Sequence, residues 1–188
     1  MLSLQAEDQE RQEGLGAVLA RCCPAACIIY LEGDLGTGKT TLVRGFLRGM
    51  GYRGKVRSPT YTLIEPYECG GNSLYHLDLY RLAHPEELEY LGLRDLLQRD
   101  AILLIEWPER GQGMLPADDL RVRIHYRPVG RRLELTAAKL ATLAEGVRQL
   151  ASQRDPLAAE SSRRAATSSH RAMAARMLAK TPSRTMGS

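Results

Sequence analysis

The sequence predicts an α/β fold, with a mostly parallel β-sheet flanked by helices and antiparallel hairpins at the sheet edges. Two short apolar runs, residues 26–31 and 101–106, have the length and composition of strands that are buried on both faces. Residues 42–50 carry apolar side chains at helical spacing and stop at Gly51, a residue type that commonly ends helices. Segments of alternating apolar and polar residues supply the hairpins.

The first strand and the first long helix are joined by G-x-x-x-x-G-K-T, which is typical of a P-loop NTPase-type fold. Glycines let successive N–H groups turn toward phosphate oxygens, and the helix dipole attracts the same anion. In such loops the lysine reaches the β- and γ-phosphates, and the hydroxyl that follows it binds Mg²⁺. The predicted phosphate site consists of Gly33, Asp34, Leu35, Gly36, Thr37, Gly38, Lys39, Thr40 and Thr41.

Periodicity and turn residues predict the remaining elements. They are an amphipathic helix (7–21), a loop (51–58), two strands (59–65 and 74–80) around a hairpin turn (69–72), short helices after Pro85 that are interrupted at Gly92, a loop (107–116) and a closing hairpin (120–135).

Two carboxylates end predicted strands, where the carboxyl ends of a parallel sheet face the ligand crevice. Asp78 is the natural Walker B-type acid, holding Mg²⁺ directly or through water; the alternative is an acid that caps a loop. Glu106 completes the Mg²⁺ shell or orients the attacking water, unless it is only an acid in a salt bridge. We predict Lys39, Asp78 and Glu106 as catalytic residues, and Thr40, Asp78 and Glu106 as metal ligands.

Three other residues near these strands are open to two interpretations. Thr60 lies where a nucleotide hydrolase has its switch segment, so it contacts Mg²⁺ or the γ-phosphate, or it belongs to a turn that enters a strand. Trp107 follows Glu106 directly and is either a packing anchor or a residue that faces the nucleotide or a partner. We interpret His76 as an ordinary strand residue, satisfied by hydrogen bonds and not a catalyst.

Charge is unevenly distributed along the 188 residues. Residues 151–188 hold seven of the 26 Lys and Arg but two of the 22 Asp and Glu, so the rest of the chain is close to neutral. The pI near 9.0 therefore describes a tail and does not indicate a nucleic-acid-binding face. The four cysteines show no paired metal-binding spacing, and the acidic N-terminal segment is unlike a signal peptide, so we expect a cytoplasmic protein.

Apolar patterning divides the chain into three parts. We predict a P-loop domain over residues 1–137 and a helix over 138–150, where apolar residues fall on one helical face. Residues 151–188 are rich in Ala, Ser and Arg and nearly free of large apolar side chains, so we expect a disordered basic tail.

Four motifs occur in a fixed order: GDLGTGKTT at 33–41, SPTYT at 58–62, HLDLYR at 76–81 and IEWPE at 105–109. Together they resemble the TsaE (YjeE) family, bacterial ATPases that are needed to make threonylcarbamoyladenosine in tRNA. The resemblance covers about residues 7–137. It implies a compact ATPase with weak turnover that uses ATP and Mg²⁺. It also implies that the chain acts with the proteins TsaD and TsaB, and meets tRNA only through that complex, in which the adenosine beside the anticodon is modified with the help of TsaC.

The resemblance also implies roles for single residues. Lys39 and the loop amides would bind phosphates, Thr40 and Glu106 would hold Mg²⁺, and Asp78 would be the Walker B acid. It adds Thr60, Trp107 and Arg131 to the nucleotide-binding set. The chain departs from the family at Gln12, where members often have threonine.

Two other functions remain open from the residues. A small-molecule P-loop kinase would need a lid with paired arginines over the phosphates. The sequence shows no such insertion, and Arg81 alone is weak support for a lid. A nucleotide-gated assembly factor would bind ATP without needing to hydrolyse it. A GTPase is disfavoured because the sequence has no Asn-Lys-x-Asp guanine-reading motif.

Overall fold

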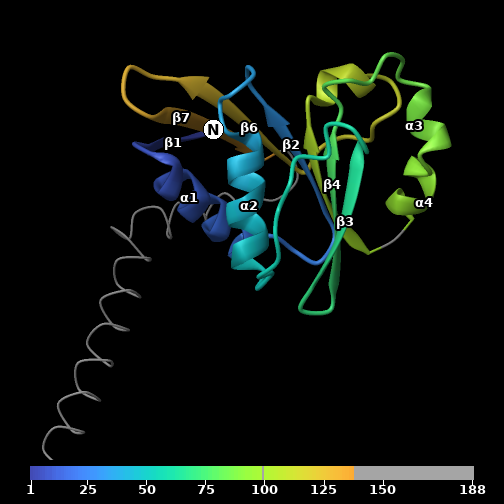
Figure 1. The fold of residues 1–188 in the computed structure, drawn as a ribbon, viewed down its shortest axis with the longest axis horizontal. Helices are drawn as coiled ribbons and strands as arrows, with labels where there is room; N and C mark the ends of the chain where they lie inside the picture. Colours follow the sequence, from blue (N-terminus) through green and yellow to red (C-terminus); the bar gives the residue numbers. More distant parts are fainter. Residues whose placement is uncertain (99, 138–188) are drawn as a thin grey trace, which may run out of the picture. The chain divides into compact units, whose positions relative to one another are not determined.

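A computed structural model describes residues 1–98 and 100–137 and arranges them around one seven-stranded sheet (Figure 1). The strand order is β1-β7-β6-β2-β5-β4-β3. The strands are β1 (Leu2–Ala6), β2 (Cys27–Glu32), β3 (Ile64–Cys69), β4 (Asn72–Asp78), β5 (Ala101–Glu106), β6 (Leu120–Tyr126) and β7 (Arg131–Ala137). The helices are α1 (Gln9–Cys22), α2 (Lys39–Gly49), α3 (Glu87–Tyr90), α4 (Leu93–Leu97) and the 3₁₀ helix η1 (Pro108–Gly111). The predicted helix at 138–150 and the predicted tail lie outside the described residues.

The centre of the sheet is parallel and its edges are antiparallel, which confirms the predicted fold class. Strand β2 pairs in parallel with both β5 and β6, and β5 pairs in parallel with β4. The β3–β4 and β6–β7 hairpins are antiparallel. Strand order reverses beside β2, so the loop that follows β2 emerges at the point where ligands bind in sheets of this type.

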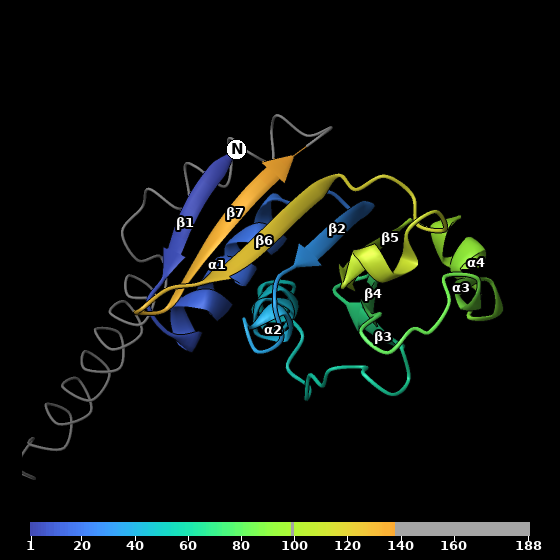
Figure 2. The ribbon, with the colours of Figure 1, turned by 90° about the horizontal axis from the view of Figure 1, so that it is seen from above.

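Helices cover both faces of the sheet, and alternation along each strand decides which side chain meets which layer. In β2, Cys27, Ile29 and Leu31 join the core beneath α1 and α2, whereas Tyr30 joins the core beneath α3 and α4. Figure 2 shows α2 lying beneath the end of β2, with α3 and α4 beside β4 and β5. The end of β2 and the start of α2 therefore lie within one well-packed layer.

Helices α1 and α2 approach each other closely through glycines. A Cβ added to Gly45 would lie 1.9 Å from the Glu13 carbonyl oxygen, and one added to Gly16 would lie 2.2 Å from that of Leu42. Real Cβ atoms do not come within 3.0 Å of such atoms, so only glycine fits at these positions. This contact brings the first turn of α1 to the loop that precedes α2.

Two local predictions were incomplete or wrong. Strand β1 was not predicted, because Leu2 and Leu4 are only partly buried at the sheet edge and the strand is held mainly by pairing with β7. The strand predicted over 59–65 begins at Ile64 instead. Residues before it form a turn in which the Leu63 amide donates to the Pro59 carbonyl at 2.6 Å, and Leu63 has a positive φ of 62°.

No helix in the described part of the chain combines the length and the apolar character that a bilayer crossing requires.

Candidate phosphate-binding site

The loop between β2 and α2 adopts a backbone that its glycines make possible. Gly33 has φ 138°, and a Cβ there would lie 2.4 Å from the Ile124 carbonyl oxygen of the neighbouring strand. Gly38 occupies the N-cap of α2 with φ 94°, a left-handed conformation that side chains disfavour. The spacing of the two outer motif glycines thus follows from the shape of the loop.

Side chains from three other elements hold the loop by its carbonyl oxygens. The Tyr126 hydroxyl donates to Leu35 at 2.6 Å, and the Arg131 guanidinium donates to Gly36 at 3.2 Å and to Thr37 at 3.3 Å. The Gln12 amide donates to the carbonyls of Thr37 and Gly38 at 3.1 and 3.0 Å. A trans peptide points its N–H opposite to its C=O, so these contacts turn the following amides toward the other side of the loop. The loop is therefore prepared to donate several N–H groups to an anion.

Lys39 is buried against the same loop. Its Nζ donates to the carbonyls of Gly33 at 2.6 Å and Asp34 at 3.0 Å, and it lies 3.8 Å from the centroid of the Trp107 ring. Burial lowers the pKa of the Lys39 ammonium, although the nearby carboxylates of Glu106 and Asp78 act in the opposite direction. Phosphate oxygens would offer this cation better partners than the two carbonyls do.

The two predicted carboxylates lie opposite each other at the ends of neighbouring strands, where Asp78 is in register with Glu106. Alternation places both on the sheet face that α2 covers, because Leu74 and Leu104 of the same strands face that layer. Glu106 Oε1 accepts a hydrogen bond from the Thr40 hydroxyl at 2.8 Å. The loop, the first turn of α2 and both acids therefore form one site.

Asp78 connects this site to the segment before β3. Its Oδ2 accepts from the Ser58 hydroxyl at 2.6 Å and from the Thr60 hydroxyl at 3.0 Å, and its Oδ1 accepts from the Tyr80 amide at 3.2 Å. The backbone of Thr60 lies in a turn before β3, as the second interpretation has it. Its side-chain hydroxyl nevertheless donates to Asp78, the predicted acid. A ligand that competes for Asp78 would release this segment.

Trp107 lies over Lys39 with a strained backbone. Its φ of 58° and ψ of 50° are left-handed, which costs a non-glycine residue about 1–2 kcal/mol. Contacts of the ring with Lys39 and with Tyr80, whose ring centroid is 5.0 Å away, offset that cost. Strain of this kind is common where a side chain must be held over a site.

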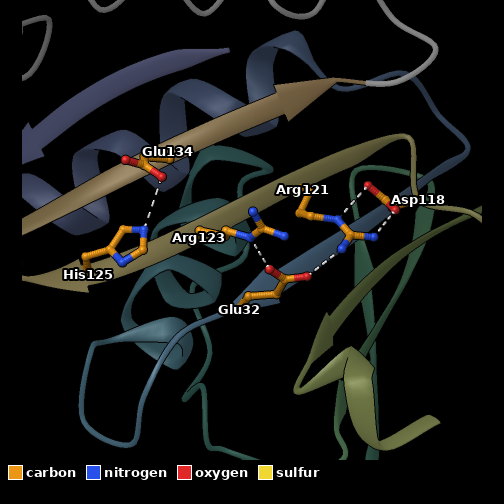
Figure 3. A network of polar contacts seen from close by, with 6 residues as sticks. All are labelled: Glu32, Asp118, Arg121, Arg123, His125 and Glu134. Atoms are coloured by element: carbon orange, nitrogen blue, oxygen red, sulfur yellow. Dashed lines mark hydrogen bonds and ion pairs between the residues drawn. The ribbon is translucent and has the colours of Figure 1, made fainter. Parts of the chain in front are cut away.

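Ion pairs on the opposite face of the sheet hold the strand end from which the loop starts (Figure 3). Glu32 directly precedes Gly33 and accepts from Arg121 at 2.7 Å and from Arg123 at 2.5 Å, both on the adjacent strand β6. Arg121 also donates to Asp118 at 2.6 Å. Since β6 continues to Tyr126, the strand that anchors the base of the loop also carries the tyrosine that holds its tip.

The oxygen ligands present would suit a magnesium ion that is shared with phosphates. Within residues 1–98 and 100–137 no group of three or more His, Cys, Asp or Glu could hold a metal alone. Mg²⁺ commonly uses one or two protein oxygens together with phosphates and waters. Thr40, Glu106 and Asp78 match that pattern.

Buried polar side chains of the described residues converge on this site. They are Gln12, Thr37, Lys39, His76, Asp78 and Glu106. Sequence reasoning included four of them as site residues and missed the other two, Gln12 and His76. His76 forms a hydrogen bond through Nε2, whose partner at 2.8 Å is Glu106, but its buried Nδ1 has no partner among the described residues, so the prediction of a fully satisfied histidine holds only in part. A signal was available, since His76 precedes Asp78 by two residues and so shares its strand face.

Other predicted residues contribute less directly. Leu35 is exposed at the tip of the loop and contributes its backbone. Thr41 lies in the first turn of α2. Arg131 supports the loop carbonyls and stacks on Tyr126, with its guanidinium carbon 4.5 Å from the ring centroid.

This loop, its position after a central parallel strand and the surrounding helices define a P-loop fold. The family model for "Threonylcarbamoyl adenosine biosynthesis protein TsaE" matches residues 6–133. The chain therefore belongs to the TsaE family.

Relatives of known name agree with this assignment. The tRNA threonylcarbamoyladenosine biosynthesis protein TsaE of Haemophilus influenzae is 57% identical over 112 residues, which cover 60% of this chain and 71% of that protein. The protein of the same name from Bacillus subtilis is 33% identical over 142 residues, covering 70% and 89%. The crystal structure of Bacillus subtilis YdiB superposes with a TM-score of 0.68 at 28% identity and covers 79% of this chain and 94% of that one.

Proposed function

We propose that this protein binds ATP with Mg²⁺ and hydrolyses it slowly, and that it thereby supports a TsaD–TsaB complex in the threonylcarbamoylation of the tRNA adenosine beside the anticodon. Membership of the TsaE family supports the pathway. The geometry of the site supports the nucleotide, and tRNA enters the proposal only through the complex.

The observation that carries the proposal is that side chains from outside the loop hold its carbonyl oxygens in place by hydrogen bonds. Tyr126, Arg131 and Gln12 come from β6, β7 and α1, and each donates to the same short stretch of backbone. A glycine turn without a ligand would not need support from three elements. Fixing these peptides in advance orients the N–H groups that bind phosphate, so little ordering is required when the nucleotide arrives.

The remaining side chains fit the other tasks of a nucleotide hydrolase. Lys39 would exchange its two carbonyl partners for phosphate oxygens, and Thr40, Glu106 and Asp78 would hold Mg²⁺. The ion supplies charge neutralisation at the phosphates when it is bound. Alternatively, Glu106 would orient the attacking water.

Nucleotide state would control the surface that partners meet. The segment carrying Ser58 and Thr60 is tied to Asp78, and Trp107 is packed on Lys39. Both contacts involve groups that phosphates and Mg²⁺ would engage, so binding would rearrange both segments together. Equal affinity of this protein for the TsaD–TsaB pair with an ATP analogue, with ADP and without nucleotide would contradict this part of the proposal.

The chain carries its own reporter for nucleotide binding, because Trp107 is its only tryptophan and lies against Lys39. We expect titration with Mg-ATP to change the Trp107 emission in a saturable way. The Lys39→Ala variant, in which the main phosphate cation is missing, should show no saturable change. GTP at the same concentrations serves as the comparison nucleotide. An unchanged emission, with no binding by calorimetry either, would refute the proposed nucleotide site.

A further inference from the structure

We propose that His76 is a positioning residue: its imidazole fixes the Glu106 carboxylate and, through it, the Thr40 hydroxyl in the orientation that a nucleotide-bound Mg²⁺ requires. The inference rests on the proposed function, because it concerns the metal side of the same site. It assigns a task to a buried histidine that the proposed mechanism does not otherwise use.

Burial and register place His76 behind the acid. Its side chain is fully buried, with 0% exposure, and its Nε2 lies 2.8 Å from Glu106 Oε1. On β4 it is in register with Leu104 of β5, two residues before Glu106 on the same sheet face. The contact is thus a diagonal cross-strand pair between two strands in the middle of the sheet, and the backbone holds both partners in place.

The hydrogen-bond network assigns the tautomer. Nδ1 of His76 is buried, and no described residue offers it a hydrogen-bond partner. A proton on Nδ1 would leave a buried donor unpaired, which is the costlier arrangement. Nε2 therefore carries a hydrogen and donates it to Glu106, so the ring serves as a donor whose position the backbone fixes.

The consequence reaches Thr40 through one oxygen atom. Glu106 Oε1 accepts from both His76 and Thr40, each at 2.8 Å. Because the threonine directs its hydrogen at Glu106, its lone pairs are left to face a cation, and Oε2 of Glu106 is the oxygen available to a water or the ion. Loss of the His76 donor would free the carboxylate to rotate and the threonine hydroxyl to seek another acceptor. Groups that orient metal ligands in this way commonly affect metal affinity about 10–100-fold.

This chain of contacts predicts a selective defect. The phosphate side of the site consists of the loop amides and Lys39, and within residues 1–98 and 100–137 none of these groups forms a hydrogen bond with His76. Removing the donor should therefore weaken nucleotide binding in the presence of Mg²⁺ and leave metal-free binding nearly unchanged. A residue that only fills space would affect both alike.

The experiment compares three variants of the full chain. In His76→Gln the amide nitrogen can occupy the place of Nε2 and donate to Glu106; His76→Leu fills the volume without a donor. His76→Asn is polar but too short to reach, and it replaces the leucine variant if that one does not fold. Affinity for a non-hydrolysable ATP analogue is measured by Trp107 emission with Mg²⁺ and with EDTA, and thermal unfolding is recorded for each variant.

We expect His76→Leu to lose about tenfold or more in the Mg²⁺ series and less than about twofold in EDTA. His76→Gln should remain within about threefold of the native protein in both series, because the donor is restored. In a Glu106→Ala background, adding His76→Leu should change Mg²⁺ dependence no further, since the group it positions is gone.

Three results would overturn the inference. They are equal losses with and without Mg²⁺, equal losses in the glutamine and leucine variants, and native affinities in all variants. In each case the native protein still binds Mg-nucleotide, so the proposed function stands. If the native protein binds no nucleotide under either condition, the proposed function and this inference fail together.

Discussion

Replacing Gly45 by alanine tests whether α1 is held against α2 as closely as the structure indicates. The new Cβ would lie 1.9 Å from the Glu13 carbonyl oxygen, and contacts below 3.0 Å do not occur, so the helices must separate locally by about 1.1 Å (3.0 minus 1.9). Overpacking of this kind costs about 1–3 kcal/mol, and a backbone obstacle places Gly45 at the upper end. Helix propensity alone predicts the opposite, a gain of about 1 kcal/mol from alanine.

Alanine substitutions at two further glycines that make close contacts between α1 and α2 allow the stability losses to be ranked. A Cβ at Gly16 would approach Leu42 oxygen to 2.2 Å, and one at Gly49 would approach Ala17 to 2.8 Å. We expect losses in unfolding free energy in the order Gly45, Gly16, Gly49, measured by urea unfolding followed by circular dichroism. Any of the three variants being more stable than the native protein would contradict the close packing, and a reversed order would contradict the distances.

A functional consequence should accompany the loss of stability. Helix α1 carries Gln12, whose amide holds the Thr37 and Gly38 carbonyls at 3.1 and 3.0 Å. A separation of about 1 Å would stretch both contacts beyond hydrogen-bond range. Gly45→Ala should therefore also weaken nucleotide binding at temperatures where the variant remains folded. Native affinity in the folded variant would show that Gln12 does not support the loop.

Three further outcomes follow from the site. Tyr126→Phe removes the hydroxyl that holds Leu35 and should weaken ATP binding about 2–10-fold with little change in the melting temperature; unchanged affinity in a titration would contradict this. Because burial lowers the pKa of Lys39, the ammonium loses its proton as pH rises through a value below that of an ordinary lysine, so ATP affinity measured from pH 8 to pH 10 should fall. The Lys39→Arg variant, whose guanidinium stays protonated over this range, should show no such slope, and an equal slope in both proteins would assign it to another group. Asp78→Asn should loosen the Ser58 segment, seen as faster proteolysis between α2 and β3, whereas identical cleavage rates would show that Asp78 does not hold it.

The centre of the fold was predictable because local signals agree there. The apolar runs of β2 and β5, the P-loop spacing and the periodicity of α2 each indicate the same strand-loop-helix unit. Edge elements were harder to predict from the sequence. Strand β1 is short and half-exposed, and it is stabilised by pairing with β7, which is distant in the sequence. The start of β3 was misplaced because side-chain bonds to Asp78 fix a turn where alternation suggests a strand.

Residues that support the loop were difficult to predict for a related reason. Tyr126 reaches Leu35 because β6 lies next to β2, and strand order is not encoded in local periodicity. Gln12 is 25 residues from Thr37 in the sequence, and glycine packing brings it close. The predicted acids were easier, since both end apolar strands at the carboxyl edge.

Phosphate release from Mg-ATP, measured for this protein alone and with purified TsaD and TsaB, tests the central claim most directly. Lys39→Ala is the blank, because it removes the buried cation of the loop and should abolish turnover. We predict a slow rate for the protein alone that rises when both partners are added. Turnover that ignores the partners and requires a small-molecule acceptor would contradict the account and indicate a kinase.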